Sequence, residues 1–354
     1  MKKKKILFCH TSLSTFVKND LDFLSTKYEV IPFYYASGKT KLLKIRNIFS
    51  SFIFTLTWIW GVDAVYCWFG GYHCFWPVFI AKLLRKKSII IVGGYDAGNI
   101  PSLNYGVFHK PSALQSCIRR TYKAATYLCP VSQALVASIN KYSDPSGVGF
   151  KIGLLHHIPE IKNKIKIIPT DYDESYWTFD TNKKREGILA LAYVSNPETY
   201  KLKGFDLLTE CARILPEYKF TFAGFSPSMT VKYKKDLPAN ITLMSFQSKE
   251  QARELYQQHK IFVIPSMTEG LPNTLCEAML CGCLPIGSNV SVISEIIGQN
   301  GFILENKNAT KLAQLIFNAS NIEKYSHENI RQRIIHLFPF GSRIKVILDL
   351  ISEP

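Results

Sequence analysis

The sequence predicts an α/β fold with two Rossmann-like domains, each built on a doubly wound parallel sheet. Short apolar strand patterns alternate with helical patterns in the first half of the chain, as they do in βαβ units. A polar stretch at 169–187 interrupts this alternation, which then begins again. The length of 354 residues also suits two domains of about 100–200 residues each.

The first half predicts strands that are mostly apolar and helices in the intervals between them. The strands are expected at 5–9, 29–35, 64–69, 88–93, 126–131 and 165–168. The helices are expected near 15–25, 41–60, 74–86, 112–124 and 132–141. We place this first domain at 1–170 and a linker at 171–184.

The second half repeats the pattern, and we place the second domain at 185–338. Its strands are expected at 188–194, 219–223, 241–244, 261–264 and 284–286. Its helices are expected near 204–214, 249–259, 273–281, 291–297 and 309–318. A final apolar helix within 341–354 is compatible with either domain, including packing back on the first.

Composition excludes several classes of protein. A chain with 47% hydrophobic residues can form packed cores and is not disordered. Its nine cysteines include no CxxC pair, and several lie inside apolar runs, which favours reduced cysteines and a cytoplasmic location. The apolar run at 6–9 is too short for the core of a signal peptide and fits a first strand better.

The net charge of +16 is distributed unevenly along the chain. Residues 1–180 contain 23 basic and 11 acidic residues (+12), and residues 181–354 contain the other 20 and 16 (+4). Such a surplus suggests an anionic partner, either nucleic acid or a membrane surface. Because no nucleic-acid-binding motif accompanies the basic clusters, we expect an anionic membrane surface rather than nucleic acid.

The longest uncharged apolar run, at 48–62, follows a basic stretch at 39–46. It is shorter than the roughly 20 residues that a membrane span needs, and Asp63 ends it. Two interpretations stay open. A basic stem before a Phe- and Trp-rich helix fits a bilayer interface, and the same run fits a helix buried on both sides in the domain.

The strand, loop and helix at 261–283 contain the most informative motif, IFVIPSMTEGLPNTLCEAMLCGC. Gly270 allows a ligand to approach the backbone, and Pro272 suits the first helical turn. The N-terminal end of the following helix favours a phosphate. Glu269 in the loop and Glu277 in the helix can bind two polyhydroxylated parts of one ligand, such as a sugar and a ribose.

This motif resembles the donor-site signature of the retaining glycosyltransferases of family 4, in which two glutamates stand eight positions apart. Further segments resemble the same family in the same order. They are Lys203-Gly204-Phe205-Asp206-Leu207-Leu208, the strand Phe220 to Gly224, and the block from Asn240 to Ser266. The resemblance implies the GT-B fold, with two Rossmann-like domains that face each other across a cleft. It also implies a nucleoside-diphosphate sugar as donor.

The resemblance implies a role for each matching residue. Glu277 would bind the ribose hydroxyls, Glu269 would contact the transferred sugar as a catalytic residue, and Lys203 would neutralise the diphosphate. The residues expected to bind the donor are Lys203, Gly204, Gly224, Gly270, Leu271, Pro272, Asn273 and Glu277. No cofactor and no metal are expected.

The sequence departs from the family pattern at several positions. Relatives often have an Arg before the Lys-Gly pair, where this chain offers only Lys201 as a nearby cation. The family's first-domain histidine is absent from Gly93-Gly94-Tyr95-Asp96, which makes Asp96 our first-domain candidate for catalysis, with a turn residue as the alternative. Further candidates for donor or acceptor contacts are Gly93, Gly94, His73 and Ser12.

Two other patterns could indicate a metal, and we favour neither. Asp171-Tyr172-Asp173 matches the DxD motif of another glycosyltransferase fold but lies at the start of the linker. His156 and His157 are adjacent, so their side chains point apart, and no carboxylate accompanies them.

We therefore expect an enzyme that transfers a sugar from a nucleoside-diphosphate sugar to a lipid-linked or cell-surface glycan precursor, with retention of configuration. The location expected is cytoplasmic and peripheral at the inner face of the membrane. Two alternatives remain. One is a soluble acceptor, and the other is a catalytically silent relative that only binds a nucleotide sugar or a partner, which the missing His and Arg would explain.

Overall fold

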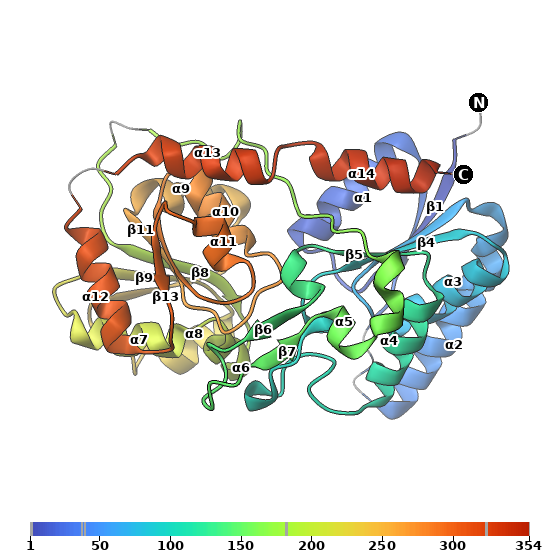
Figure 1. Cartoon of the computed structure of the whole chain (residues 1–354), viewed down its shortest axis with the longest axis horizontal. Coiled ribbons are helices and arrows are strands. Elements are labelled where there is room, and N and C mark those ends of the chain that lie inside the picture. Colours follow the sequence, from blue (N-terminus) through green and yellow to red (C-terminus); the bar gives the residue numbers. More distant parts are fainter. Residues whose placement is uncertain (1–2, 37, 39, 181–182, 323–324, 354) are drawn as a thin grey trace. The chain divides into compact units, whose positions relative to one another are not determined.

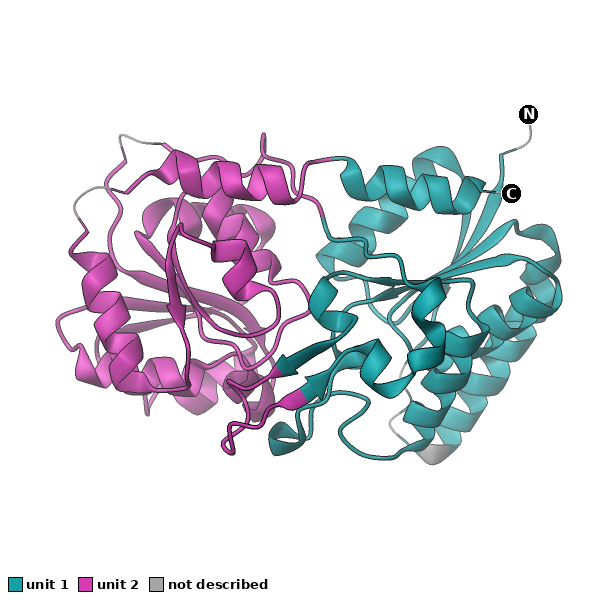
Figure 2. Cartoon of the chain, in the orientation of Figure 1, with its two compact units in different colours: residues 1–139, 151–170, 341–354 teal, residues 140–150, 171–340 magenta. Residues whose placement is uncertain are grey.

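The computed structural model describes residues 3–36, 38, 40–180, 183–322 and 325–353. The chain divides into two compact units, shown in Figure 2. Unit 1 contains residues 1–139, 151–170 and 341–354, and unit 2 contains 140–150 and 171–340. The division after Thr170 is the expected end of the first domain. The described part of the expected linker belongs to unit 2, however, and the C-terminal helix belongs to unit 1.

Unit 1 is built on a five-stranded parallel sheet in the order β2-β1-β3-β4-β5 (Figure 1). The strands are β1 (Lys5–His10), β2 (Glu29–Tyr34), β3 (Ala64–Trp68), β4 (Lys87–Val92) and β5 (Tyr127–Pro130). Every residue of β3 is buried, because strands pair on both of its edges and helices cover the sheet. The direction of the crossovers reverses at β1, so the topological switch point lies between β1 and β3.

Helices connect these strands, and polar N-caps fix where several of them begin. They are α1 (Thr15–Lys27), α2 (Lys41–Trp58), α3 (Tyr72–Leu83), α4 (Ala113–Ala124), α5 (Leu154–His157) and the C-terminal α14 (Ser342–Ser352). Short 3-10 turns include η1 (Ile59–Gly61) and η2 (Tyr95–Ala97). Thr40 accepts a hydrogen bond from Leu43 N at 3.3 Å, and Ser112 accepts one from Gln115 N at 3.1 Å.

Two expected elements of the first half are wrong. The helix expected at 132–141 is a 3-10 turn at Gln133–Leu135 followed by β6 (Ser138–Asn140), which pairs with β7 (Phe150–Ile152). The β-branched residues after the turn favour a strand. The strand expected at 165–168 makes only a bridge between Ile165 and Leu128, because it runs beside β5 over too few residues for a ladder.

The interpretation of 48–62 as a helix buried on both sides is also wrong. In the most apolar 18-residue window of the span Leu42–Gly61, only 17% of the residues are buried. By length and composition alone, this is the one helix among the described residues that is long and apolar enough to cross a membrane. Lys39, in the basic stretch before it, lies outside the described residues.

Unit 2 is built on a six-stranded parallel sheet in the order β10-β9-β8-β11-β12-β13. The strands are β8 (Ile188–Val194), β9 (Phe220–Phe225), β10 (Ile241–Ser245), β11 (Ile261–Ile264), β12 (Leu284–Ser288) and β13 (Phe302–Leu304). The strand order reverses at β8, which places the switch point of this sheet between β8 and β11. The sequence-based prediction missed β13, a strand of only three residues.

The helices of unit 2 cover this sheet. They are α6 (Pro197–Leu202), α7 (Phe205–Ile214), α8 (Pro227–Tyr233), α9 (Lys249–Gln258), α10 (Asn273–Leu280), α11 (Ile293–Ile297), α12 (Ala309–Ser320) and α13 (His327–Leu337). Aromatic side chains fill the core between helices and sheet, among them Phe205, Phe222 and Phe262, each at most 1% exposed. The prediction lacked α6, α8 and α13.

Candidate active site

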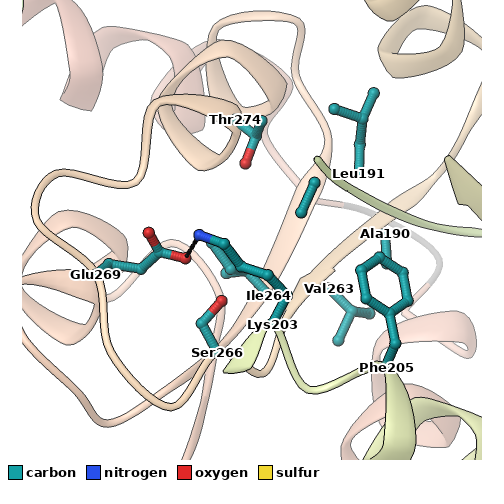
Figure 3. A pocket seen from close by; sticks show the side chains of 10 residues that line it. Ala190, Leu191, Lys203, Phe205, Val263, Ile264, Ser266, Glu269 and Thr274 are labelled. Atoms are coloured by element: carbon teal, nitrogen blue, oxygen red, sulfur yellow. Dashed lines mark hydrogen bonds and ion pairs between the residues drawn. The ribbon is translucent and has the colours of Figure 1, made fainter. Parts of the chain in front are cut away.

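A pocket lies at the switch point of the unit 2 sheet. Its walls come from β8, β11, the loop after β11 and the beginnings of two helices, and they consist of Ala190, Leu191, Ala192, Lys203, Phe205, Val263, Ile264, Ser266, Glu269 and Thr274 (Figure 3). Ligands of open α/β sheets bind beyond the carboxyl ends of the strands at such a point. The fold therefore brings together Lys203 and Glu269, two of the residues that the sequence predicts.

Lys203 is positioned by the tight connection between α6 and α7. Its backbone ends α6, where Lys203 N donates to Thr199 O at 2.9 Å, and Gly204 then begins α7 with a φ of +74°. A Cβ on Gly204 would lie 2.3 Å from Pro265 O. Only glycine fits this left-handed position against the end of β11, so Gly204 holds the Lys203 backbone beside the pocket.

Lys203 and Glu269 form an ion pair inside the pocket. Lys203 Nζ donates to Glu269 Oε1 at 2.7 Å, and Figure 3 shows the two side chains pointing toward each other. Their side chains are 25% and 10% exposed, so the pair is partly withdrawn from water. Glu269 is also held through its backbone, since Glu269 N donates to Ser291 Oγ at 3.2 Å. A cation and a carboxylate are thus presented side by side at the ligand position of the sheet.

Sequence reasoning did not assign a role to Ser266, although it quoted this residue within the Pro-Ser pair after β11. Ser266 is 1% exposed and lines the pocket. Its Oγ is buried and lacks a hydrogen-bond partner among the described residues. Since a buried hydroxyl without a partner is costly, it offers a free donor and acceptor to a bound ligand.

The loop 270–272 leads from Glu269 into α10. The sequence predicts Pro272 in the first turn of this helix, but in the structure Pro272 lies directly before it. Leu271 is buried, and the Asn273 side chain accepts a hydrogen bond from Tyr172 OH at 2.6 Å. This contact anchors the start of α10, and Thr274 in its first turn lines the pocket. The predicted role of Gly270, Leu271, Pro272 and Asn273 in donor binding stays a prediction.

Glu277 lies on α10, one turn after its start, and is not among the residues that line the described pocket. Tyr256 OH donates to Glu277 Oε2 at 3.1 Å. Burial raises the pKa of Glu277 to about 7, although the Tyr256 hydroxyl and the Lys249 charge both act to lower it. Near neutral pH this carboxyl group therefore exchanges between its charged and neutral forms.

We expect nucleotide affinity to depend on pH through Glu277. If the carboxylate accepts both ribose hydroxyls and the neutral acid does not, a pKa of about 7 makes a nucleoside diphosphate bind about tenfold more weakly at about pH 6 than at about pH 8. Isothermal titration with a panel of nucleoside diphosphates at both pH values measures this ratio. Glu277→Gln is the matched control, because its affinity should be weaker at high pH and change less with pH. An unchanged pH profile in this variant would contradict the assignment.

Two further candidates lie in unit 2, and one of them has a role in the fold. Gly224 has a φ of +101°, and a Cβ there would lie 2.2 Å from Ala192 O, so glycine allows β9 to approach β8 closely. Lys201 lies exposed on α6. Their predicted contacts with the donor stay predictions.

In unit 1, Asp96 holds a group of loops. It is 1% exposed in η2, and its carboxylate accepts hydrogen bonds from Gly70 N at 2.8 Å, Gly93 N at 3.1 Å and Gly94 N at 3.0 Å. Tyr122 OH donates to the same carboxylate at 3.1 Å. Burial raises the pKa of Asp96, and the backbone donors Gly70 and Gly94 and the Tyr122 hydroxyl act against this rise. This arrangement favours a positioning role, and the predicted direct contact with sugar or acceptor stays a prediction.

The other unit 1 candidates differ in accessibility. His73 lies in the first turn of α3 instead of a loop and is 2% exposed, with Nε2 at 3.0 Å from Trp68 O. Burial lowers its pKa, so the neutral ring donates from Nε2 to this carbonyl and serves the structure. Gly93 packs its Cα against the Phe69 ring, where a Cβ would lie only 2.2 Å away. Ser12 is exposed in the loop after β1.

Within the described ranges, no group of three or more His, Cys, Asp or Glu side chains is placed to hold a metal ion. Asp173, from the DxD-like triplet, instead accepts hydrogen bonds from Ser175 N at 2.9 Å and Ser175 Oγ at 2.5 Å. It therefore forms a turn in which the Asp side chain accepts from the backbone two residues further on.

Comparison with known proteins places this site in context. Residues 179–335 match the model of the family described as glycosyl transferases group 1. The amylovoran biosynthesis glycosyltransferase AmsK of Erwinia amylovora is 28% identical over 137 residues, which cover 34% of each chain. The alpha-galactosylglucosyldiacylglycerol synthase of Streptococcus pneumoniae is 25% identical over 218 residues, which cover 58% of this chain and 55% of that protein. The chain spans about a third of the length of the first curated relatives it matches.

Solved structures are similar over nearly the whole chain. Anabaena HepE, in a complex with UDP and glucose, has a TM-score of 0.69 at 14% identity, covering 99% of this chain and 100% of HepE. The lipopolysaccharide galactosyltransferase WaaB has a TM-score of 0.65 at 16% identity, covering 98% and 99%. The family match and the named relatives support a transferase enzyme. The chain therefore has the GT-B fold, and its residues 179–335 match the glycosyl transferases group 1.

Proposed function

We propose that this chain is a retaining glycosyltransferase that moves a sugar from a nucleoside-diphosphate sugar to the hydroxyl of an acceptor. The observation that carries the proposal is the Lys203–Glu269 pair in the pocket at the β8/β11 switch point. The match of residues 179–335 to a glycosyltransferase family and the UDP in HepE support it.

In this proposal the two side chains exchange partners when the donor binds. Lys203 leaves Glu269 for the diphosphate, whose negative charge grows as the sugar departs. Glu269 is then free to accept hydrogen bonds from hydroxyl groups of the transferred sugar. The pair seen at 2.7 Å keeps both groups satisfied while the pocket holds no donor.

The transfer step requires one bond to form and one to break at the anomeric carbon. The acceptor oxygen bonds to this carbon on the face from which the diphosphate leaves, so the configuration is retained. The proton of the acceptor hydroxyl passes to the departing diphosphate oxygen, and no covalent enzyme intermediate forms. The protein contributes positioning and electrostatic stabilisation, with Lys203 as the cation nearest to the developing charge.

On the acceptor side we propose a lipid-linked or cell-surface glycan precursor at an anionic membrane surface. The names of two relatives, a synthase of a glycosyldiacylglycerol and an enzyme of amylovoran biosynthesis, support this class. The surplus of 12 positive charges in residues 1–180 supports the anionic surface. The enzyme would then work in the cytoplasm, peripherally at the inner face of the membrane.

A panel of nucleotide sugars tests the proposal. The purified chain is incubated with each donor, and release of the nucleoside diphosphate is measured. We expect slow hydrolysis of at least one donor and its loss in Glu269→Ala. Tight nucleotide binding without turnover of any donor, with or without acceptor lipids, would favour a catalytically silent relative.

A further inference from the structure

The outer side of α2 carries a continuous apolar stripe. Its side chains recur every three or four residues, so they lie on one face of the helix and of the turn that follows it. They are Leu42 (77% exposed), Ile45 (65%), Phe49 (63%), Ile53 (48%), Leu56 (37%) and Trp60 (67%). A stripe of this length on a surface helix marks an interaction site.

The opposite side of α2 is fixed to unit 1, so the stripe cannot turn inward. Ser51 and Thr55 are fully buried there. The Phe52 ring lies 4.7 Å from that of Trp76, and the Phe54 ring stacks on Phe33 at 4.5 Å. These contacts also argue against a membrane-spanning helix, because a span would have to leave the sheet that it covers.

The neighbouring helix α3 also exposes apolar side chains. It packs beside α2, as Figure 1 shows, and presents Phe79 (42% exposed) and Leu83 (69%) one turn apart. Lys86, which follows α3, binds the turn that follows α2, because its Nζ donates to Trp60 O at 3.0 Å and Val62 O at 2.6 Å. We call the α2 stripe together with Phe79 and Leu83 the α2–α3 face.

Basic residues accompany the α2–α3 face. Residues 41–86 contain six basic residues (Lys41, Lys44, Arg46, Lys82, Arg85 and Lys86) and one acidic residue, Asp63, for a net charge of +5. Lys44, Arg46, Lys82 and Arg85 are exposed. A symmetric dimer through this face would place the same positive charges against each other, which disfavours a second copy as its partner.

We propose that the α2–α3 face binds the interface of an anionic lipid bilayer, with α2 lying parallel to the membrane surface. The apolar stripe enters the boundary between headgroups and acyl chains, and the exposed lysines and arginines contact anionic headgroups. Trp60 suits this depth because indole combines an apolar ring with a polar N–H. The inference rests on the membrane acceptor of the proposed function and assigns the surface that reaches it.

Vesicle flotation tests the inference with the full chain. We expect it to float with phosphatidylcholine vesicles that contain phosphatidylglycerol, and to bind phosphatidylcholine alone weakly. Ile45→Ser/Phe49→Ser should lower the affinity by about tenfold, since two exposed apolar groups leave the bilayer. Val231→Ser/Phe317→Ser, which alters exposed apolar residues of unit 2, is the matched control and should float like the wild type.

Tryptophan emission, oligomeric state and nucleotide release distinguish membrane binding from the alternatives. Tryptophan emission of the chain should shift to shorter wavelength on anionic vesicles, because the exposed Trp60 leaves water, and should remain unshifted in the presence of high salt. No flotation at low salt, or equal flotation of Ile45→Ser/Phe49→Ser, would overturn the inference. A dimer that this variant dissociates would assign the face to a second copy. Release of nucleotide without vesicles should be equal in the wild type and both double variants. If none of the three releases nucleotide, the proposed function fails, but the membrane-binding inference is not affected.

Discussion

Replacing Lys203 by alanine should lower kcat/KM for nucleotide release by about 10²–10³-fold, the effect of removing one charge-stabilising group from a transition state. Lys203 is the cation that lines the pocket at the β8/β11 switch point, and its side chain is 25% exposed, so water replaces it poorly. The loss should appear mainly in kcat, because the diphosphate gains charge as the glycosidic bond breaks. Steady-state nucleotide release with the best donor of the panel measures it.

A second ion pair of unit 2 provides the matched control. Lys307 Nζ donates to Asp206 Oδ2 at 2.7 Å, the same distance as in the Lys203–Glu269 pair, but neither residue lines the described pocket. Lys307→Ala should therefore leave kcat/KM within about twofold of the wild type, as expected for a surface pair. Lys203→Arg should retain part of the activity, because it keeps the charge in a different geometry. Equal activity of Lys203→Ala and Lys307→Ala would remove Lys203 from the mechanism.

The proximity of Lys203 and Glu269 could be predicted from the sequence, because it follows from the order of strands and loops. Lys203 and Glu269 are 66 residues apart, but each follows a strand of the same parallel sheet, and parallel strands end at the same edge. The sequence pattern therefore determines that they lie near each other. Their direct pairing and the buried, unpartnered Ser266 hydroxyl depend on side-chain packing, which periodicity does not describe.

The first domain was predicted less completely. A turn after two glycines is the alternative that the sequence offers for Asp96, but its contact with Gly70 N joins a loop 26 residues away, which the sequence does not reveal. The run 132–141 has helical periodicity, yet its β-branched residues adopt a strand after a short turn. Composition also does not determine on which domain the C-terminal helix packs. In the structure α14 belongs to unit 1, and one of its side chains explains this placement.

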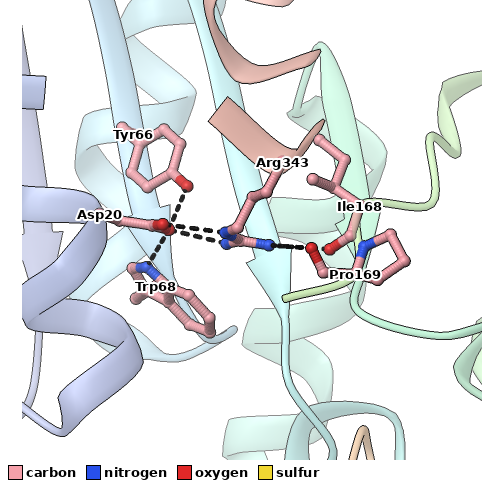
Figure 4. A network of polar contacts seen from close by, with 6 residues as sticks. All are labelled: Asp20, Tyr66, Trp68, Ile168, Pro169 and Arg343. Carbon is pink, nitrogen blue, oxygen red and sulfur yellow. Dashed lines mark hydrogen bonds and ion pairs between the residues drawn. The ribbon is translucent and has the colours of Figure 1, made fainter. Parts of the chain in front are cut away.

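That side chain is Arg343, which connects α14 to α1 inside unit 1 (Figure 4). Its Nε and Nη2 donate to Asp20 Oδ1 at 2.9 Å and Oδ2 at 2.7 Å, and its Nη1 donates to Ile168 O at 2.8 Å. Asp20 also accepts hydrogen bonds from Tyr66 OH at 2.6 Å and Trp68 Nε1 at 2.7 Å. With Arg343 3% and Asp20 5% exposed, the network is fully buried.

Replacing Arg343 by alanine should lower the free energy of unfolding of unit 1 by about 3–5 kcal/mol, the cost of breaking a buried ion pair by removing one partner. Asp20 would keep its two neutral donors but lose its only cation in the described network, so a buried charge would remain uncompensated. Urea unfolding followed by tryptophan fluorescence measures the change. Lys345→Ala removes an exposed cation from the same helix and should change the free energy by less than about 0.5 kcal/mol.

A double variant distinguishes the charge from the packing. In Asp20→Asn/Arg343→Met, the amide oxygen still accepts from Tyr66 and Trp68, and the methionine fills much of the arginine volume without leaving a charge behind. If the uncompensated carboxylate causes the loss, this variant should be more stable than Arg343→Ala by about 1–3 kcal/mol. If it is equally unstable, the contacts of Nη1 with Ile168 O and Pro169 O would carry the stabilisation instead. In both cases the stabilising groups connect α14 to segments far away in the sequence, since Arg343 and Asp20 are 323 residues apart.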